Sequence, residues 1–125
     1  MRAIRTSRGL LRRWLTLWLE DRRRARAATH VGPTVPNAPA SLVAVDWGTF
    51  IRLDWQDMSS NELGFRLYRK VDAGAYGLYQ TLGANVTTYQ DNSVVVTHQY
   101  FYYVTAYNAL GESGPSNEVF LTFGA

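Results

Sequence analysis

Few residues in this 125-residue chain have the types and spacing that catalysis or metal binding requires. The two histidines, His30 and His98, lie far apart, in a proline-rich segment and in a predicted turn, and the chain has no cysteine. A catalytic triad or a metal site ligated by thiolate or imidazole needs several such side chains together. We therefore expect no catalytic residues, no metal site and no cofactor, and we predict that the protein is not an enzyme.

The remaining groups that could do chemistry have simpler interpretations. Asp54 and Asp57 could form a carboxylate pair, but a charge at a strand end and a turn aspartate are the favoured interpretation. Gly111 and Gly114 fit a turn between two strands, and no glycine-rich phosphate loop is present. Asn85 begins an Asn-Val-Thr glycosylation sequence, which has meaning only in a eukaryotic secretory setting that nothing else in the sequence supports.

Charge divides the chain into two parts. Residues 1–31 hold nine arginines against Glu20 and Asp21, which gives a net charge of +7. The remaining residues hold four basic and eight acidic side chains, which gives a net charge of −4. Such asymmetry indicates a basic segment that has a binding partner of its own.

The basic segment is predicted to be an amphipathic helix. The leucines and tryptophans between residues 10 and 19 fall on one broad arc, and Arg12, Arg13, Thr16 and Glu20 lie opposite. Three prolines and a glycine between residues 30 and 41 then prevent the helix from continuing. We therefore divide the chain into a helical anchor arm over 1–30, a proline-rich linker over 31–40 and a domain over 41–125.

The apolar part of this arm is too short and too charged for a transmembrane span or a cleaved signal peptide. Nucleic acid is not favoured, because phosphate binding does not explain two tryptophans and five leucines on one arc. A membrane surface and a groove in a partner protein both explain that apolar arc. The arm residues expected to contact the partner are Leu11, Arg12, Arg13, Trp14, Leu15, Trp18, Arg22 and Arg23.

From Ser41 onward the pattern changes to the two-residue period of β-strands. Seven short runs rich in β-branched and aromatic residues are separated by turn sequences, without a helical pattern between them. Parallel strands would need long crossover connections, so the arrangement predicts an all-β fold, a seven-stranded antiparallel sandwich. The runs are SLVAV, TFIRLDW, FRLYRKV, YGLYQTL, TTYQD, YFYYVTAY and EVFLTF.

Alternation along these strands assigns their side chains to two faces. The residues predicted to form the structural core are Leu53, Trp55, Phe65, Leu67, Tyr100, Tyr102 and Val104. The opposite face carries aromatic and basic side chains, a combination that is typical of interface centres, although such rings can also serve only to stabilise an exposed sheet. This predicted partner-binding face consists of Arg66, Tyr68, Lys70, Phe101, Tyr103 and Tyr107. Trp47, in a turn, either covers one end of the sandwich or contacts a ligand.

The ordered set of Pro39 before SLVAV, Trp55 ending IRLDW, GFRLYRK, TTYQD and YFYYVTAYNALGESGPSNEV resembles a fibronectin type III domain over about residues 36–125. The resemblance implies that Trp55 is a core tryptophan. It also implies that Tyr100 is a tyrosine-corner residue whose hydroxyl bonds to the backbone upstream. The sequence departs from the family pattern at Val94 and Val96, where leucine and proline are usual.

Fibronectin type III modules normally work outside cells, yet no usable export signal is visible, so release by lysis is the favoured route. The leading hypothesis is a bacteriophage virion protein, a structural or decoration protein of capsid or tail, present in many copies. Its arm would dock onto other virion proteins, and its domain would be displayed or pack on neighbours.

Two other functions are compatible with the same features. One is a peripheral membrane or cell-surface adhesion module whose sandwich binds protein or carbohydrate, including carbohydrate or protein on a host surface. The other, weaker because no catalytic domain accompanies the module, is an accessory module of a polysaccharide-degrading system.

Overall fold

The computed structural model describes residues 33–125, of which Val35–Ala125 form one compact unit. The helix predicted within residues 1–30 lies outside the described residues. The described part is built from antiparallel β-strands. Their bounds are β1 (Ala40–Asp46), β2 (Ile51–Gln56), β3 (Gly64–Val71), β4 (Gly77–Gly83), β5 (Thr88–Asp91), β6 (Gln99–Asn108), β7 (Gly111–Glu112) and β8 (Val119–Thr122).

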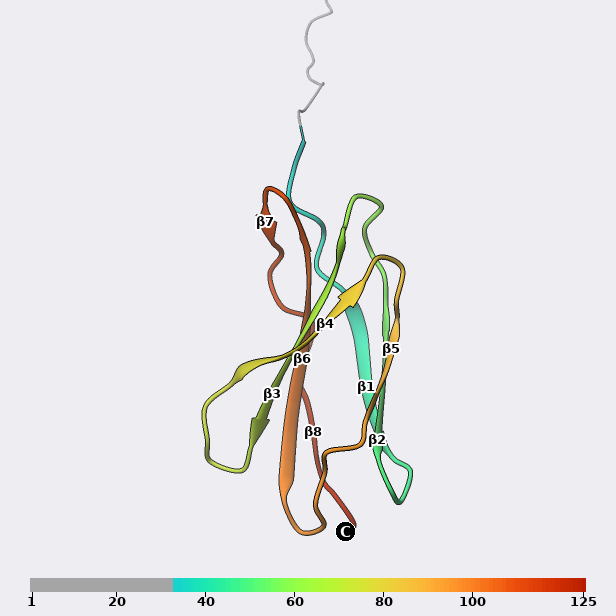
Figure 1. The fold of residues 1–125 in the computed structure, drawn as a ribbon, viewed down its shortest axis with the longest axis vertical. Coiled ribbons are helices and arrows are strands. Elements are labelled where there is room, and N and C mark those ends of the chain that lie inside the picture. The colour runs from blue at the N-terminus through green and yellow to red at the C-terminus, as the bar shows by residue number, and fades with distance from the viewer. Residues whose placement is uncertain (1–32) are drawn as a thin grey trace, which may run out of the picture. The chain divides into compact units, whose positions relative to one another are not determined.

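The strands form two sheets that pack on each other (Figure 1). One sheet has the order β1-β2-β5, and the other has the order β4-β3-β6-β7, with β8 also paired to β6. All pairings are antiparallel. This arrangement confirms the predicted all-β antiparallel sandwich.

The last predicted strand, EVFLTF, corresponds to β8, and a further short strand, β7, begins at Gly111, which was predicted to lie in a turn. Regular pairing with β6 is interrupted between β7 and β8, because serine hydroxyls there take the place of backbone carbonyls as hydrogen-bond acceptors. Ser113 Oγ accepts a hydrogen bond from the Ala106 N–H at 2.9 Å, and Ser116 Oγ accepts one from the Val104 N–H at 3.0 Å. The backbone groups of β6 are thus satisfied although regular pairing is interrupted.

The core lies between the two sheets and follows the alternation of the sequence. Residues 51, 53 and 55 of β2 are buried while their neighbours are not, as the two-residue period requires. Trp55 packs edge-on against Phe65, with ring centroids 5.9 Å apart. All seven residues predicted for the core are buried, and the cluster also includes Leu42, Ile51, Ala106 and Phe123.

The connection between β5 and β6 is fixed by Tyr100. Val95 lies five residues before Tyr100, and its N–H donates a hydrogen bond of 2.7 Å to the Tyr100 hydroxyl. This is the backbone contact that the resemblance implied. Val96, in the place where proline is usual, is exposed. Its side chain crowds Gly124, where a Cβ would lie 2.7 Å from Val96 Cγ1 and where φ is +77°, so glycine is required at that position.

A buried charged cluster joins the two sheets. Asp91, at the end of β5, is fully buried, and its carboxylate accepts hydrogen bonds from Arg69 (2.9 Å), Tyr79 (2.7 Å) and Tyr102 (2.7 Å). The guanidinium of Arg69 also lies 4.0 Å from the centroid of the Tyr79 ring. Burial, followed by the hydrogen bond to Asp91, raises the pKa of Tyr102 well above its ordinary value, so its hydroxyl remains a donor.

We predict that Asp91→Asn lowers the free energy of unfolding by about 3 kcal/mol or more, because it leaves the charge of Arg69 without a counter-ion in a largely buried position. Urea unfolding of the full chain at pH 7 measures this change. The matched control is Asp54→Asn, which removes the partner of Arg52 in a solvent-exposed pair. Equal losses in the two variants would contradict the role assigned to the buried cluster.

Candidate functional site

The outward side of β3, β6 and β8 carries a continuous set of rings and charges, which we call the aromatic face. Pairing register creates it, because Tyr68 lies opposite Tyr103, Lys70 opposite Phe101, and Phe101 opposite Phe120. Cross-strand neighbours on one side of a sheet are close enough to contact each other. The structure brings together all six residues predicted for this face, namely Arg66, Tyr68, Lys70, Phe101, Tyr103 and Tyr107.

At one end of the aromatic face lies the Glu112 cluster, formed by Arg66, Tyr68, Thr105 and Glu112. The Glu112 carboxylate accepts hydrogen bonds from Arg66 (3.0 Å), from the Tyr68 hydroxyl (2.5 Å) and from Thr105 Oγ1 (2.5 Å). Burial would raise the pKa of Glu112, but these three donors outweigh it and hold that pKa below its ordinary value. Burial and the bond to Glu112 raise the pKa of Tyr68 to about 12.

Tyr107 extends this end of the face, and its ring lies against two residues of β3. The guanidinium of Arg66 lies 4.2 Å from the ring centroid. The ring also lies close to Gly64, its cross-strand partner, where a Cβ would stand 3.0 Å from Tyr107 Cε1 and 2.0 Å from the Leu82 carbonyl oxygen. Glycine at position 64 therefore lets the ring lie against the backbone, and Tyr107 has a clear packing role.

The centre of the aromatic face is a cluster of three tyrosines. Tyr68 and Tyr103 are nearly parallel, with an interplanar angle of 13° and centroids 4.7 Å apart. Tyr76, from the β3–β4 turn, packs edge-on against Tyr103 at 4.8 Å, and its hydroxyl donates to the Glu118 carboxylate. Burial, then this bond to Glu118, raises the pKa of Tyr76 above its ordinary value.

The other end of the aromatic face is the Phe120 cluster, formed by Lys70, Phe101, Glu118 and Phe120. Lys70 Nζ lies 4.2 Å from the centroid of the Phe101 ring, and Phe101 meets Phe120 edge-on with centroids 5.3 Å apart. Phe120 is 59% exposed, whereas the three tyrosines at the centre of the face are half-buried. Within residues 33–125, neither Lys70 nor Glu118 takes part in an ion pair.

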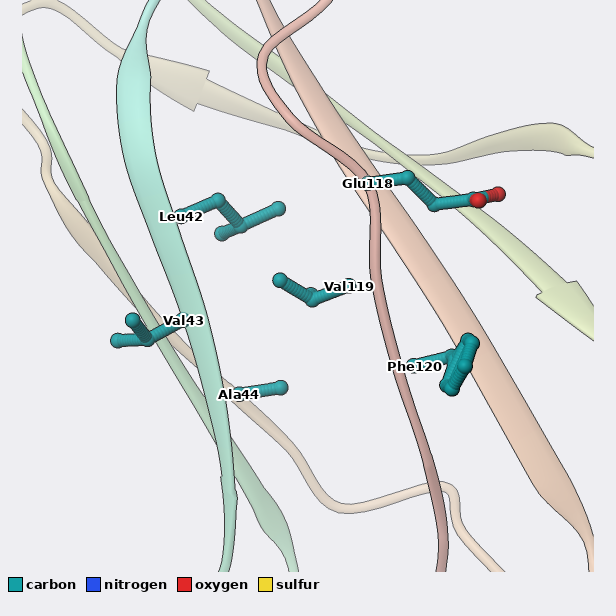
Figure 2. A pocket seen from close by; sticks show the side chains of 6 residues that line it. All are labelled: Leu42, Val43, Ala44, Glu118, Val119 and Phe120. Carbon is teal, nitrogen blue, oxygen red and sulfur yellow. The ribbon is translucent and has the colours of Figure 1, made fainter.

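A groove runs beside this cluster, between the edge strands β1 and β8 (Figure 2). Its volume is about 370 Å³, which lies within the range of ligand pockets in proteins. Figure 2 shows Leu42 and Val119 turned toward each other across the groove, while Glu118 and Phe120 extend on the other side of β8. The strand β8 thus separates an apolar groove from the exposed end of the aromatic face.

Sequence reasoning missed four members of the aromatic face: Tyr76, Glu112, Glu118 and Phe120. Glu112 was assigned to a turn and is in β7, which explains why it was not paired with Arg66 and Tyr68. Alternation in EVFLTF carried a signal for the other end of the face. If Val119 and Leu121 face inward, then Glu118 and Phe120 must face outward.

The other residues singled out from the sequence occupy ordinary structural positions. Trp47 lies in the β1–β2 turn, is 59% exposed, and stacks on Phe50 with an interplanar angle of 4°. Asp57 accepts a hydrogen bond from the Ser59 N–H at 3.0 Å, as expected of a turn aspartate. His98 Nδ1 lies 2.6 Å from a carboxylate oxygen of Asp72.

Among the described residues, no group of histidine, aspartate and glutamate side chains is arranged to hold a metal ion. The described part of the chain also contains no helix long and apolar enough to span a membrane. The arm residues predicted to bind a partner, from Leu11 to Arg23, lie outside the described residues.

We predict that the stabilising effect of Glu112 is lost in acid. A lowered pKa means that its carboxylate stabilises the fold above the ordinary value of 4.5, and that this contribution disappears as pH falls through the lower folded value. The stability difference between wild type and Glu112→Gln, measured by urea unfolding, should therefore be largest near neutral pH and should narrow below about pH 4. A difference that stays constant between pH 7 and pH 3 would contradict this assignment.

Sequence comparison relates this chain to segments of two curated bacterial proteins. No family model matches the sequence. Amylopullulanase of Thermoanaerobacterium thermosulfurigenes is 35% identical over 88 residues, which cover 68% of this chain and 5% of that protein. Amylopullulanase of Thermoanaerobacterium saccharolyticum is 32% identical over 80 residues, which cover 62% of this chain and 6% of that protein. The chain thus spans about a twentieth of the length of these curated relatives, and neither is a bacteriophage protein.

Solved structures agree on the fold. An Fn3-like protein from Clostridium thermocellum is 26% identical with a TM-score of 0.59, and the match covers 74% of this chain and 97% of that one. A β-1,2-glucanase from Parabacteroides distasonis is 29% identical with a TM-score of 0.62, and the match covers 73% of this chain and 13% of that one. Residues 35–125 therefore form a domain of the Fn3-like β-sandwich type, with the core tryptophan and tyrosine corner that the sequence resemblance implied.

Proposed function

We propose that this chain is a non-catalytic accessory module whose sandwich binds polysaccharide, with glucans as the ligand class. The observation that carries the proposal is the match to amylopullulanases, in which a segment related to 80 to 88 residues of this chain makes up about a twentieth of a far longer protein. The match to a small part of a β-1,2-glucanase structure supports the same ligand class. The predicted carbohydrate-binding alternative is thereby preferred to the virion hypothesis.

The chemistry of the aromatic face supports this ligand class. A pyranose ring presents an apolar C–H face and a rim of hydroxyls that donate and accept hydrogen bonds. Sites for such ligands combine ring faces with a few polar groups that set orientation. The aromatic face offers exposed and half-buried rings together with the ammonium of Lys70 and the carboxylate of Glu118.

The proposal assigns no reaction to the domain. Its most enclosed carboxylates are already engaged in structural hydrogen bonds. Asp91 binds Arg69, Glu112 accepts three donors, and Glu62 accepts hydrogen bonds from Ser59 and from the Asn85 N–H. A carboxylate that serves as a fixed acceptor in the fold is poorly placed to act as a general acid or base.

The virion hypothesis finds no support in the described residues or in the relatives of this chain. It depended on an arm that docks into a particle lattice, and the arm lies outside the described residues. The relatives named above are bacterial amylopullulanases, so they give that hypothesis no support. A location at the cell surface or outside the cell, where polysaccharide is met, forms part of the present proposal.

Co-sedimentation of the full chain with granular starch tests the proposed function. Salt at about 0.5 M screens attraction by the basic segment, because the Debye length then falls to a few ångströms. We expect the chain to sediment with starch and to be released by soluble pullulan, which competes for the same surface. Serum albumin and an added galactomannan serve as controls for non-specific adsorption and non-specific release. Binding no greater than that of albumin, or no release by pullulan, would refute the proposal.

A further inference from the structure

The two ends of the aromatic face differ in whether their polar groups are satisfied within the fold. In the Glu112 cluster, one carboxylate receives a guanidinium, a phenol and a hydroxyl, and Arg66 also covers Tyr107. Binding a ligand there would require breaking charge-assisted hydrogen bonds, each of which is stronger than a neutral one. This end of the face stabilises the packing of β3, β6 and β7.

The Phe120 cluster is different because its polar groups have hydrogen-bond donors and acceptors that the fold does not use. Lys70 contacts ring faces, at 4.2 Å from the Phe101 centroid and 5.3 Å from that of Tyr76, and it has no carboxylate partner within residues 33–125. Glu118 is exposed and accepts one hydrogen bond, from Tyr76, while a carboxylate can accept about four. Three donors on Lys70 and the free acceptor sites on Glu118 therefore face solvent beside an exposed ring.

The register sets these groups around Phe120. Lys70, Phe101 and Phe120 form one row across β3, β6 and β8, because each is the cross-strand neighbour of the next. Glu118 precedes Phe120 by two residues and therefore projects from the same side of the chain, toward Tyr76. One cation and one anion thus border a platform of phenyl rings, and together they add no net charge.

We infer that the Phe120 cluster is the subsite that receives a neutral pyranose unit of the polysaccharide, an inference that rests on the proposed function. The C–H face of the sugar stacks on the exposed Phe120 ring. Its hydroxyls accept hydrogen bonds from Lys70 and donate them to Glu118. A balanced pair of charges matches an uncharged, polyhydroxylated ligand, whereas an anionic or cationic polymer would meet one repelling group.

The groove between β1 and β8 indicates the path that a bound polysaccharide would follow beyond the subsite. Phe120 and Glu118 border the groove, and the partly buried Ala44 and Val119 contribute to its apolar lining, whereas Leu42 belongs to the core and is only 1% exposed (Figure 2). A sugar stacked on Phe120 stands beside the rim of this groove, so adjacent units of the same polymer can continue along β8. Residues of a glucan outside the subsite would then add apolar contacts without further charged groups.

Phe120→Ala tests this inference against a matched control. We expect the variant to bind pullulan about tenfold more weakly in isothermal titration, the usual effect of removing a central aromatic anchor. The control is Trp47→Ala, which removes a ring of the same 59% exposure in the β1–β2 turn and should change the affinity less than twofold. Circular dichroism and the thermal midpoint show whether each variant has kept its fold.

Phe120→Leu separates ring stacking from simple apolar filling. Leucine retains much of the apolar area but has no flat face, so we expect it to bind pullulan nearly as weakly as the alanine variant. Wild-type binding that persists in both Phe120 variants, or that is lost in Trp47→Ala instead, would overturn the subsite while leaving the proposed function intact. Absence of wild-type binding to both starch and pullulan would refute the proposed function itself, and the subsite with it.

Discussion

The carboxylate of Asp91 is the group on which the arrangement of the two sheets most depends. It belongs to β5 in one sheet, and it binds Arg69, Tyr79 and Tyr102 from β3, β4 and β6 in the other. A fully buried charge is tolerated only where a partner and hydrogen bonds replace its hydration. Since three strands must converge on one carboxylate to supply them, the cluster fixes how the sheets are aligned, whereas apolar side chains alone accept several packings.

This alignment also determines what the outer surface presents. Once Arg69, Leu67 and Phe65 point inward along β3, the intervening Arg66, Tyr68 and Lys70 must point outward. The same alternation in β6 buries Tyr100 and Tyr102 and presents Phe101 and Tyr103. The aromatic face is therefore the necessary reverse of a well-specified core, and its rings meet because the two strands pair in a single register.

Much of this could be predicted from the sequence, because a two-residue period read over short strands fixes both the core and the outward set. The Asp91 cluster was missed, although it left a signal: in GFRLYRK, Arg69 shares the inward parity of Phe65 and Leu67. A cation at an inward position requires a buried acid, and only tertiary pairing shows that β5 supplies it. The short strand β7 was missed because it has only two residues and no alternating pattern, and because serine side chains after it bind the backbone N–H groups of β6.

A protein surface that carries rings and charges does not bind ligands wherever they occur, because most such groups are partners of one another. Arg66, Tyr68 and Glu112 satisfy each other, so a sugar hydroxyl placed among them could only exchange one hydrogen bond for another. Lys70 and Glu118 keep donor and acceptor sites that no group of residues 33–125 occupies, beside an exposed ring, so a ligand could use those sites without breaking the fold. The proposed sugar subsite is placed at the Phe120 end because of this difference in internal satisfaction, and not because of the number of aromatic rings at each end.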